Sequence, residues 1–155
     1  MIASTANSRA ATIRAATPAD LPRVERLLEA SDLPLAGVRD ALGDFVVAEA
    51  DGELVGVAGL EICCDDALLR SVAVHPDWRS KGVGRALVTR AISDAEARGI
   101  QALYLLTTTA ERYFPSFGFQ KITREEVPQA VRETDEFTKA CPASAAVMSR
   151  QLHAN

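Results

Sequence analysis

The sequence has 155 residues, 48% of them hydrophobic and 25% charged, so the chain is long enough to bury a sizeable core as one globular domain. Its net charge of -4, with acidic and basic residues interspersed, provides no basic stripe for nucleic-acid phosphates, and we expect no nucleic-acid partner. No apolar run approaches the roughly 20 residues of a membrane span, and no secretion signal opens the chain, so we expect a cytoplasmic protein that contacts no membrane.

The N-terminal part of the chain predicts a strand and a helix. Residues 1–10 are small and polar without periodicity, which predicts a disordered N-terminus before a single domain at 11–155. A short strand is expected at Ala11–Ala15. Thr17 can then cap a helix, and Asp20 complements the positive helix end. The apolar stripe of this helix recurs at spacings of three and four, at Leu21, Val24, Leu27 and Leu28.

A β-hairpin and a third strand form the centre of the predicted sheet. The segment Ala36–Leu42 is a brief helical piece between breakers, which predicts a movable flap. Apolar, β-branched runs follow at Phe45–Ala50 and Leu54–Cys63. They are joined through Asp51-Gly52, a strong signal for a two-residue hairpin turn. The third strand is expected at Ala67–Val74.

The second half of the chain alternates between helix and strand. Gly82–Arg98 is predicted to form a long helix that ends at Gly99, and Ala102–Leu106 returns as a buried strand. The elements expected after it are a short helix between Thr109 and Gly118, strands at Phe119–Thr123 and Ser144–Leu152, and a weakly helical segment at Glu126–Lys139. Together these elements predict a mixed sheet flanked by helices.

The three cysteines are Cys63, Cys64 and Cys141, which form neither a disulfide framework nor the Cys-x-x-Cys spacing of a zinc site. Neighbouring residues on a strand point to opposite faces, so Cys63 and Cys64 cannot easily share an ion. We therefore expect reduced thiols and no metal site. Binding of a soft metal or an arsenical through the thiols remains an alternative.

The most informative stretch is 68–85, where a strand with a buried pattern passes through a turn into the long helix. A helix N-terminus offers unpaired N–H donors and about half a positive charge, and Gly82 and Gly84 let an anion approach the backbone. The cations of this stretch are Arg79, Lys81 and Arg85. This geometry suits a phosphate group, although a bare Gly-x-Gly taken alone favours an ordinary strand-to-helix turn. A dinucleotide fingerprint is excluded because its third glycine position holds Leu87.

Two ordered motifs resemble the GNAT acetyltransferase superfamily. The family's pyrophosphate loop, Arg/Gln-x-x-Gly-x-Gly/Ala, is matched by residues 79–84, and residues 72–76 look like its fourth strand. Residues 110–119 are similar to its Ala-x-x-Phe-Tyr-x-x-x-Gly-Phe segment. The resemblance covers roughly Ile13–Leu152. It implies an acetyl-CoA-dependent N-acetyltransferase with the GNAT α/β (α+β) fold, a mixed, mostly antiparallel sheet of six to seven strands flanked by about four helices.

Within the superfamily the chain is similar to amino-acid acetyltransferases, in particular the arsenic-resistance (ArsN-type) enzymes, and more distantly to N-acetylglutamate synthase. The residues that carry this likeness are 69–74, 105–110 and 141–145. The likeness implies a small amino-acid substrate, glutamate-like in shape, acetylated on its α-amino group. Arsinothricin or phosphinothricin would suit such a site, with resistance by detoxification as the outcome. Many relatives are dimers, so a homodimer is a possible assembly.

The resemblance also implies a coenzyme site. The residues expected to bind acetyl-CoA are Val72, Ala73, Val74, Arg79, Ser80, Lys81, Gly82, Val83, Gly84, Arg85 and Phe114. Phe114 holds the position of the family's usual Tyr general acid and has no proton to give. Tyr113 lies one residue earlier, about 100° away around a helix, and is the candidate acid, with packing in the core as its alternative. Water or the departing ammonium are alternative proton sources, and N–H groups near Val72 and Val74 are expected to stabilise the oxyanion.

Arg70 interrupts an otherwise apolar strand, and a buried guanidinium requires anionic partners. An acceptor carboxylate would satisfy it bidentately, and the alternative is a structural pair with Glu49, Glu61 or Asp66. Glu61 is the candidate base for the acceptor ammonium, with a solvated or ion-paired strand residue as its alternative. The further candidates for acceptor contacts are Ser71, Thr107, Thr108 and Arg132.

Two other functions stay open at this point. A module that binds acetyl-CoA without catalysis would account for Phe114, and acetyl transfer to a protein N-terminus or lysine would need an open groove. The enzyme hypothesis predicts a V-shaped opening between the strands at 67–74 and 102–106, beside the helix that starts near Gly82. His75 and His153 are expected in turn and surface roles.

Overall fold

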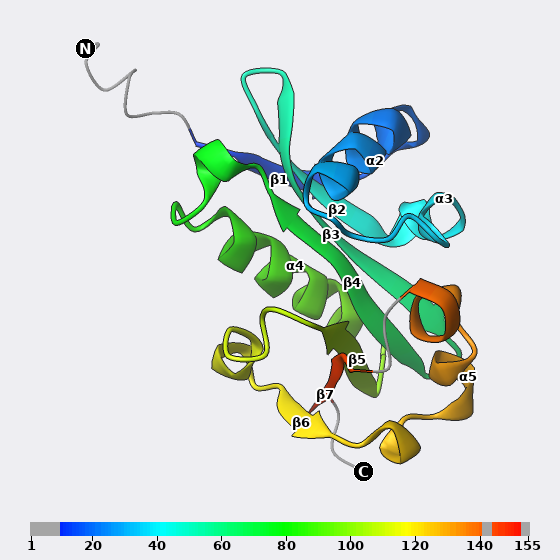
Figure 1. Cartoon of the computed structure of the whole chain (residues 1–155). Helices are drawn as coiled ribbons and strands as arrows, with labels where there is room; N and C mark the ends of the chain where they lie inside the picture. The colour runs from blue at the N-terminus through cyan, green and yellow to red at the C-terminus, as the bar shows by residue number, and fades with distance from the viewer. Residues whose placement is uncertain (1–9, 141–143, 153–155) are drawn as a thin grey trace.

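A computed structural model of the chain describes residues 10–140 and 144–152, whose strands form one sheet in the order β1-β2-β3-β4-β5-β7-β6 (Figure 1). The strands are β1 (Thr12–Ala15), β2 (Phe45–Ala50), β3 (Glu53–Cys63), β4 (Asp66–Val74), β5 (Ala102–Thr107), β6 (Gln120–Ile122) and β7 (Ala146–Gln151). Every pairing in this sheet is antiparallel except that of β4 with β5. The expected mixed, mostly antiparallel sheet is thereby confirmed.

Helices cover both faces of this sheet. The α-helices of the described residues are α2 (Leu21–Ala30), α3 (Val38–Ala41), α4 (Val83–Ala97) and α5 (Gln129–Arg132). Short 3-10 turns lie at Pro18–Asp20, Leu42–Asp44, Pro76–Trp78, Phe114–Phe117 and Arg124–Glu126, and a π-helical turn, η6, spans Glu136–Ala140. No helix within these described ranges is both long and apolar enough to cross a membrane.

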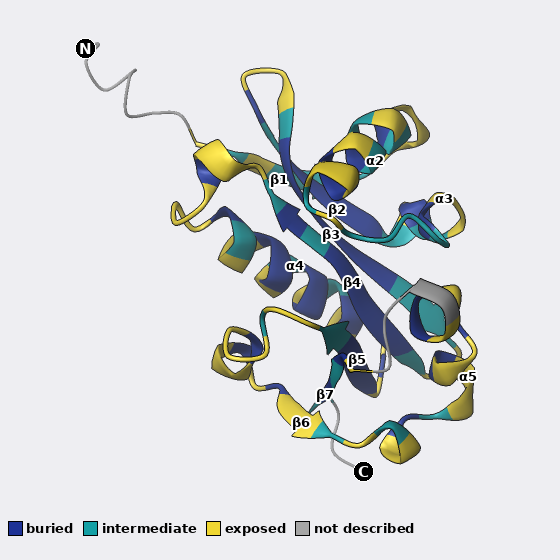
Figure 2. Ribbon diagram, in the orientation of Figure 1, coloured by how far each residue is buried: buried dark blue, intermediate teal, exposed yellow. Residues whose placement is uncertain are grey.

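The alternation of side chains along each strand divides the core between the two faces. Val88 of α4 packs on one face with Leu69 and Leu103, and Val24 of α2 packs on the other with Val47. The central strands are buried on both sides, and exposed residues lie on the outer helix surfaces (Figure 2). The apolar periodicity of the sequence is therefore what positions α2 and α4.

The hairpin turn agrees with its sequence prediction. Asp51 and Gly52 have φ angles of 53° and 78°, and Ala50 pairs with Glu53 across the two-residue loop. Positive φ at both central residues is the geometry that an Asp-Gly turn favours. The long helix was also predicted to within one residue at each end, because Gly82 precedes it in a left-handed conformation with a φ of 84°.

The predicted helix between Thr109 and Gly118 was wrong in extent, since only the turn at Phe114–Phe117 is helical. The hydroxyl of Thr107 accepts hydrogen bonds from the N–H groups of Thr109 and Ala110, which favours a turn there. The strand expected at 119–123 is shortened to β6, and the segment expected at 126–139 contains two short helical pieces. The structure does not describe residues 1–9 of the N-terminal stretch 1–10, for which disorder was predicted, nor Cys141 and His153.

Candidate functional site

Strands β4 and β5 are paired at one end and separate toward the other (Figure 1). The parallel register joins Asp66–Leu68 to Ala102–Tyr104, and no described residue of β4 beyond Leu68 pairs with β5. A cavity of about 790 Å³ occupies the gap, bordered by Leu69–Val74 on one side and Leu105–Ala110 on the other. The V-shaped opening expected between these two strands is confirmed.

A β-bulge in β4 shapes one wall of this cavity. Ser71 and Val72 together oppose the single residue Ala58 of β3. Ser71 has a φ of 59°, in the left-handed region that residues other than glycine rarely adopt. Because β5 has already diverged at this point, Val72 and its main-chain groups border the cavity. Such groups can stabilise a developing oxyanion.

The start of α4 lies at the same cavity. Gly82 caps the helix without a side-chain hydrogen bond, and a Cβ built on it would meet no heavy atom within 4 Å. Ser80 and Gly82 both have positive φ, so the loop turns sharply into the helix. Arg79 and Gly84 line the cavity. The space beside Gly82, at the start of a 15-residue helix, is therefore open, and the unpaired amides of such a helix start can bind anions.

Exposed cations surround this helix start. Arg79 Nε donates a hydrogen bond to the carbonyl oxygen of Val74 at 3.2 Å, which orients the side chain beside the loop. The Arg85 guanidinium lies 4.8 Å from the centroid of the Phe117 ring, a cation–π contact. Lys81 is exposed on the loop between them. These side chains add positive charge to the partial charge of the helix end.

Tyr113 and Phe114 lie in opposite surroundings. Phe114 is 6% exposed, and its ring packs edge-on against Phe119 at a centroid distance of 5.8 Å. Tyr113 is 37% exposed and lines the cavity, and its hydroxyl would lie 3.4 Å from a Cβ built on Gly84. Partial burial raises the pKa of Tyr113, although Arg85 lowers it, so the phenol is protonated at neutral pH. Packing in the core, the alternative for Tyr113, is not what the structure shows.

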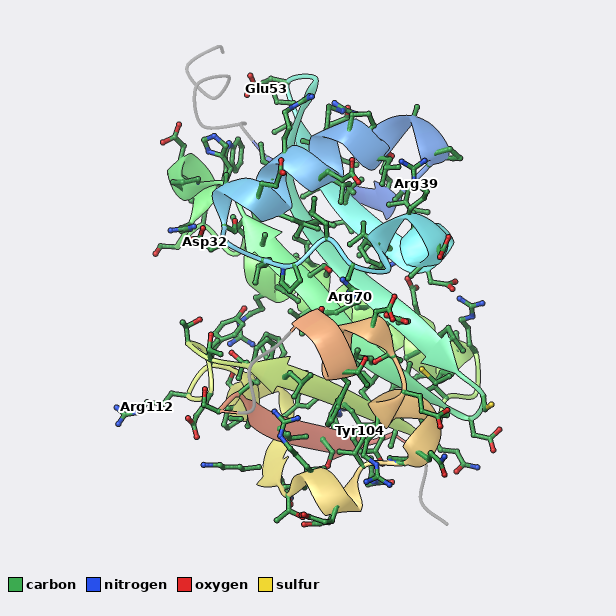
Figure 3. The ribbon with its side chains drawn as sticks, turned by 45° about the vertical axis from the view of Figure 1, so that its right-hand side comes forward. Asp32, Arg39, Glu53, Arg70, Tyr104 and Arg112 are labelled. Atoms are coloured by element: carbon green, nitrogen blue, oxygen red, sulfur yellow. The ribbon has the colours of Figure 1, made fainter. Side chains whose placement is uncertain are left out.

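Arg70 lies at the other end of the cavity, in the middle of the molecule (Figure 3). Its Nε donates to Ser71 Oγ at 3.0 Å, and its Nη1 donates to Glu61 Oε1 at 3.0 Å. Its Nη2 lies 3.3 Å from Glu136 Oε1. Gly37, with a φ of 80°, covers the guanidinium so closely that an added Cβ would lie 3.0 Å from Nη1. The structural pair with Glu61 that the sequence left open is thus present.

The remaining acceptor candidates are divided by the fold. Thr107 and Thr108 line the cavity together with Ser71. Arg132 is exposed on α5 and is not among the lining residues, because its neighbour Val131 takes the buried side of that short helix. Glu61 does not line the cavity either, and its carboxylate is held by Arg70.

Two acidic residues that the sequence analysis did not select do line the cavity. Asp32 follows α2 in an exposed loop, and Glu136 begins η6 with 5% of its surface exposed. Neither stands in a motif, and a single acidic residue in an irregular segment gives no periodic signal. Their position at the cavity depends on tertiary packing.

His75, Cys63 and Cys64 are not among the residues that line the cavity. His75 Nδ1 accepts a hydrogen bond from the N–H of Asp77 at 3.1 Å, which is the expected turn role. Cys63 is half-buried, and burial raises the pKa of its thiol to about 11, which disfavours the thiolate that binds metals. Cys64 is exposed in the following turn. Within residues 10–140 and 144–152, no group of three or more His, Cys, Asp or Glu is arranged to hold a metal ion.

The chain is similar in sequence to bacterial amino-acid acetyltransferases. The amino-acid acetyltransferase of Pasteurella multocida is 30% identical over 131 residues, which cover 79% of this chain and 30% of that protein. The amino-acid acetyltransferase of Azotobacter vinelandii is 35% identical over 91 residues, 57% of this chain and 21% of that protein. The chain therefore spans less than a third of the length of these two relatives.

Solved structures share the fold. The N-acetylglutamate synthase of Neisseria gonorrhoeae, in complex with coenzyme A and N-acetyl-glutamate, matches with a TM-score of 0.80 and 27% identity, over 94% of this chain and 36% of that chain. The ribosomal-protein-S18-alanine N-acetyltransferase of Escherichia coli matches in fold with a TM-score of 0.73 and 23% identity, over 94% of this chain and 96% of that one.

The profile of the acetyltransferase (GNAT) domain matches residues 41–121. This span is more than half of the chain and contains the hairpin, both strands of the V-shaped opening, the start of α4 and Tyr113. On the strength of that match, supported by the geometry of the cavity, this chain belongs to the GNAT acetyltransferase family.

Proposed function

We propose that this protein transfers the acetyl group of acetyl-CoA to the α-amino group of a small, glutamate-like amino acid. The observation that carries the proposal is one cavity lined both by the start of a long helix and by a buried guanidinium. A donor that carries a diphosphate and an acceptor that bears a carboxylate match these two features.

The residues at the start of α4 fit the diphosphate of acetyl-CoA. The amides at 82–85 would hold it, since Gly82 leaves open space in front of the helix. Arg79, Lys81 and Arg85 would add charge, and Phe114 would provide an apolar wall. The likeness to the Neisseria gonorrhoeae synthase, which was solved with coenzyme A, supports this choice of donor.

Bound acetyl-CoA supplies an activated thioester, and the chain's own groups assist its transfer. We assign the main-chain N–H of Val72 to the carbonyl oxygen of the thioester, on which negative charge develops during attack. Tyr113, protonated and facing Gly84, would give its proton to the departing sulfur. No covalent intermediate with the protein is required.

The acceptor end suits an amino acid with an acidic group. Arg70 lines the cavity, and its Nε and Nη1 bind Ser71 and Glu61, so that Nη2 is the nitrogen next to Glu136. Thr108 offers a hydroxyl on the opposite wall. Arsinothricin and phosphinothricin are glutamate analogues with an anionic head, and the likeness to arsenic-resistance enzymes over 69–74 and 105–110 favours them as acceptors. Acetylation would then detoxify either compound.

A thiol-release assay with acetyl-CoA tests the proposal on a panel of amino acids, arsinothricin, phosphinothricin and a lysine-containing peptide. We expect turnover with the glutamate-like compounds and none with the peptide. Arg70→Lys keeps the positive charge but loses the planar guanidinium with its paired N–H donors. It should therefore raise the acceptor KM at least about tenfold. Arg90→Lys, on the surface of α4, is the matched control.

Each result of this assay has a distinct meaning. Background rates with every acceptor would leave a module that binds acetyl-CoA without catalysis. Turnover with the peptide alone would replace the amino-acid acceptor with a protein. An unchanged acceptor KM in Arg70→Lys would remove that side chain from the acceptor site.

A further inference from the structure

At the acceptor end of the cavity, the buried guanidinium of Arg70 lies against two carboxylates. Arg70 Nη1 binds Glu61 at 3.0 Å, and Arg70 Nη2 lies 3.3 Å from Glu136 Oε1 without the alignment of a hydrogen bond. The Arg70 side chain is 0% exposed and that of Glu136 is 7% exposed. Both carboxylates lie against the same guanidinium, so an acceptor that brings only anions would compete with them for Arg70.

The two carboxylates face different surroundings. Glu61 lies on β3, is 22% exposed and does not line the cavity. Glu136 lies at the first position of η6, the orange segment beside Arg70 in Figure 3, and it lines the cavity together with Arg70. The cavity lining therefore includes one guanidinium next to one carboxylate.

This pair matches the head of an α-amino acid. An α-amino acid carries an ammonium and a carboxylate on the same carbon atom, and each charge needs an opposite partner when water is excluded. Arg70 can bind the carboxylate while Glu136 binds the ammonium, so neither protein charge loses a partner. An acceptor that also brings a cationic group next to Glu136 would ease the competition for Arg70. Glu61 cannot take this role from its position behind Arg70.

We propose that Glu136 binds the acceptor ammonium and accepts its proton, a role that rests on the acetyl transfer proposed above. One N–H proton passes to the Glu136 carboxylate, and the freed lone pair forms the N–C bond with the thioester carbonyl carbon. The C–S bond then breaks, the sulfur leaves with the electron pair and gains a proton from Tyr113, and the nitrogen loses its second proton. Solvent exchange restores both side chains, so each turnover releases one proton.

The test compares Glu136→Gln with the wild-type protein in acetyl-CoA turnover with glutamate. Glu133→Gln is the control, because Glu133 is exposed four residues beyond Gln129, to which it is hydrogen-bonded. We expect kcat/KM to fall by about 100-fold or more in Glu136→Gln, as for loss of a general base, and to stay unchanged in Glu133→Gln. Glu136→Asp, which keeps the carboxylate, should retain a kcat/KM at least about tenfold above that of Glu136→Gln.

Calorimetry in the presence of coenzyme A provides a second readout. Glutarate has the acid groups of glutamate and lacks the amine. Glu136→Gln should weaken the binding of glutamate and leave that of glutarate equal or tighter, since only glutamate brings an ammonium.

The outcomes separate this inference from the proposed function. An unchanged kcat/KM in Glu136→Gln would overturn the role of Glu136. Tighter binding of both ligands with undiminished kcat would also overturn it, and would make Glu136 an internal competitor for Arg70. If Glu136→Gln fails to fold, a Glu136→Asp variant no more active than background decides against the role. The wild-type protein is measured first. Failure to acetylate every amino acid of the panel, arsinothricin and phosphinothricin included, would overturn the proposed function itself.

Discussion

Tyr113 and Phe114 are adjacent in the chain, but Phe114 is buried and Tyr113 is partly exposed. Phe114 is enclosed among aromatic rings, whereas Tyr113 stands at the edge of the cavity with its hydroxyl toward Gly84. The turn that begins at Phe114 places the two rings 73° apart in plane. A proton donor is therefore present at the cavity although the family's usual position holds a phenylalanine.

Replacing Tyr113 with Phe tests this arrangement at the level of one oxygen atom. The ring contacts with Phe114 and Phe117 are kept, so we expect no change in thermal stability. Loss of the proton donor should lower kcat by about 100-fold while the KM for acetyl-CoA changes little. Steady-state kinetics with varied acetyl-CoA measure both quantities.

Tyr104→Phe is the matched control for that variant. Tyr104 is 7% exposed, packs against Val131 and Phe137, and is not among the cavity-lining residues. Its loss of a hydroxyl should leave kcat unchanged. Equal kcat values for Tyr113→Phe and wild type would show that water or the departing ammonium protonates the thiolate.

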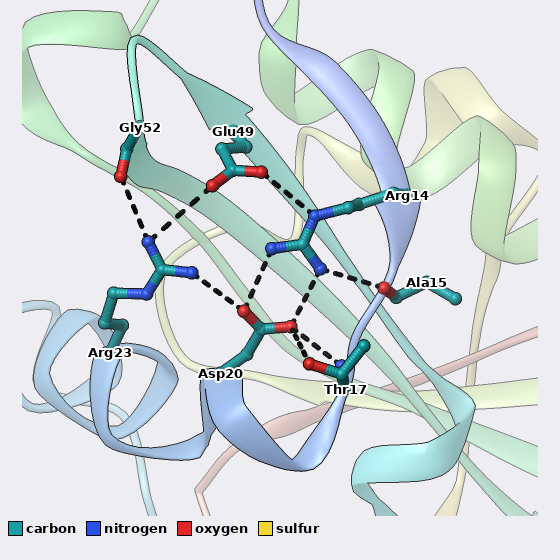
Figure 4. Close-up of polar contacts among 7 residues, drawn as sticks. All are labelled: Arg14, Ala15, Thr17, Asp20, Arg23, Glu49 and Gly52. Carbon is teal, nitrogen blue, oxygen red and sulfur yellow. Dashed lines mark hydrogen bonds and ion pairs between the residues drawn. The ribbon is translucent and has the colours of Figure 1, made fainter.

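At the scale of secondary-structure elements, a network of charged side chains joins β1, β2 and the turn before α2 (Figure 4). Asp20 accepts hydrogen bonds from both Nη atoms of Arg14, from Arg23 Nη2 and from the N–H of Thr17. Arg14 also binds Glu49 on β2 at 3.0 Å. Only 2% of the Asp20 side chain is exposed. The network fixes the first strand against the helix that follows it.

The network makes a prediction about stability and pH. Hydrogen bonds from Arg14, the largest cause, lower the pKa of Asp20 well below its usual range. Because the folded-state pKa lies below the unfolded value of about 3.9, the stabilisation is complete above that pH and is lost as the pH falls below it. Asp20→Asn should lower the free energy of unfolding at pH 7 by about 1.5–3 kcal/mol, and its deficit should shrink between about pH 4 and pH 2.

Urea unfolding at several pH values measures this difference. The control is Glu29→Gln, at an exposed position of α2. It should leave the free energy of unfolding within about 0.5 kcal/mol of wild type. A deficit of Asp20→Asn that stays constant down to pH 2 would show that packing, and not the charge of Asp20, is responsible.

Strong local signals explain which elements the sequence predicted. The turn at Asp51-Gly52 and the start of α4 at Gly82 follow from backbone conformations that few residues adopt, so local chemistry decides them. The loop with positive φ at Ser80 and Gly82 is predictable for the same reason. Arg70 was recognisable as a charge within an apolar strand. Its partner Glu61 lies nine positions earlier, on the neighbouring strand β3.

Signals were missing where tertiary packing decides the outcome. Glu136 reaches the cavity only because η6 packs beside β4, and no local pattern records that approach. Arg132 was selected by its charge alone, but α5 directs Val131 inward and leaves Arg132 at the surface. The short helix expected after Thr109 failed because a side-chain hydrogen bond to Thr107 competes with helix formation.

At the scale of the whole molecule, the sheet positions two unlike ends of one cavity. The β4–β5 pair diverges after Leu68, so α4 can bring its N-terminus to one side of the opening. On the other face of the sheet, the loop with Gly37 and the turn η6 close around Arg70. The division of the cavity into a cationic helix start and a mixed-charge end at Arg70 follows from this topology.

Amide NMR spectra of the ¹⁵N-labelled protein, recorded during titration with coenzyme A, test the central claim most directly. We predict saturable binding, with the largest shift changes at the amides of Gly82, Val83, Gly84 and Arg85, because these groups would hold the diphosphate. Absence of binding, or saturable binding whose largest changes lie away from the start of α4, would contradict the assignment of this cavity to acetyl-CoA.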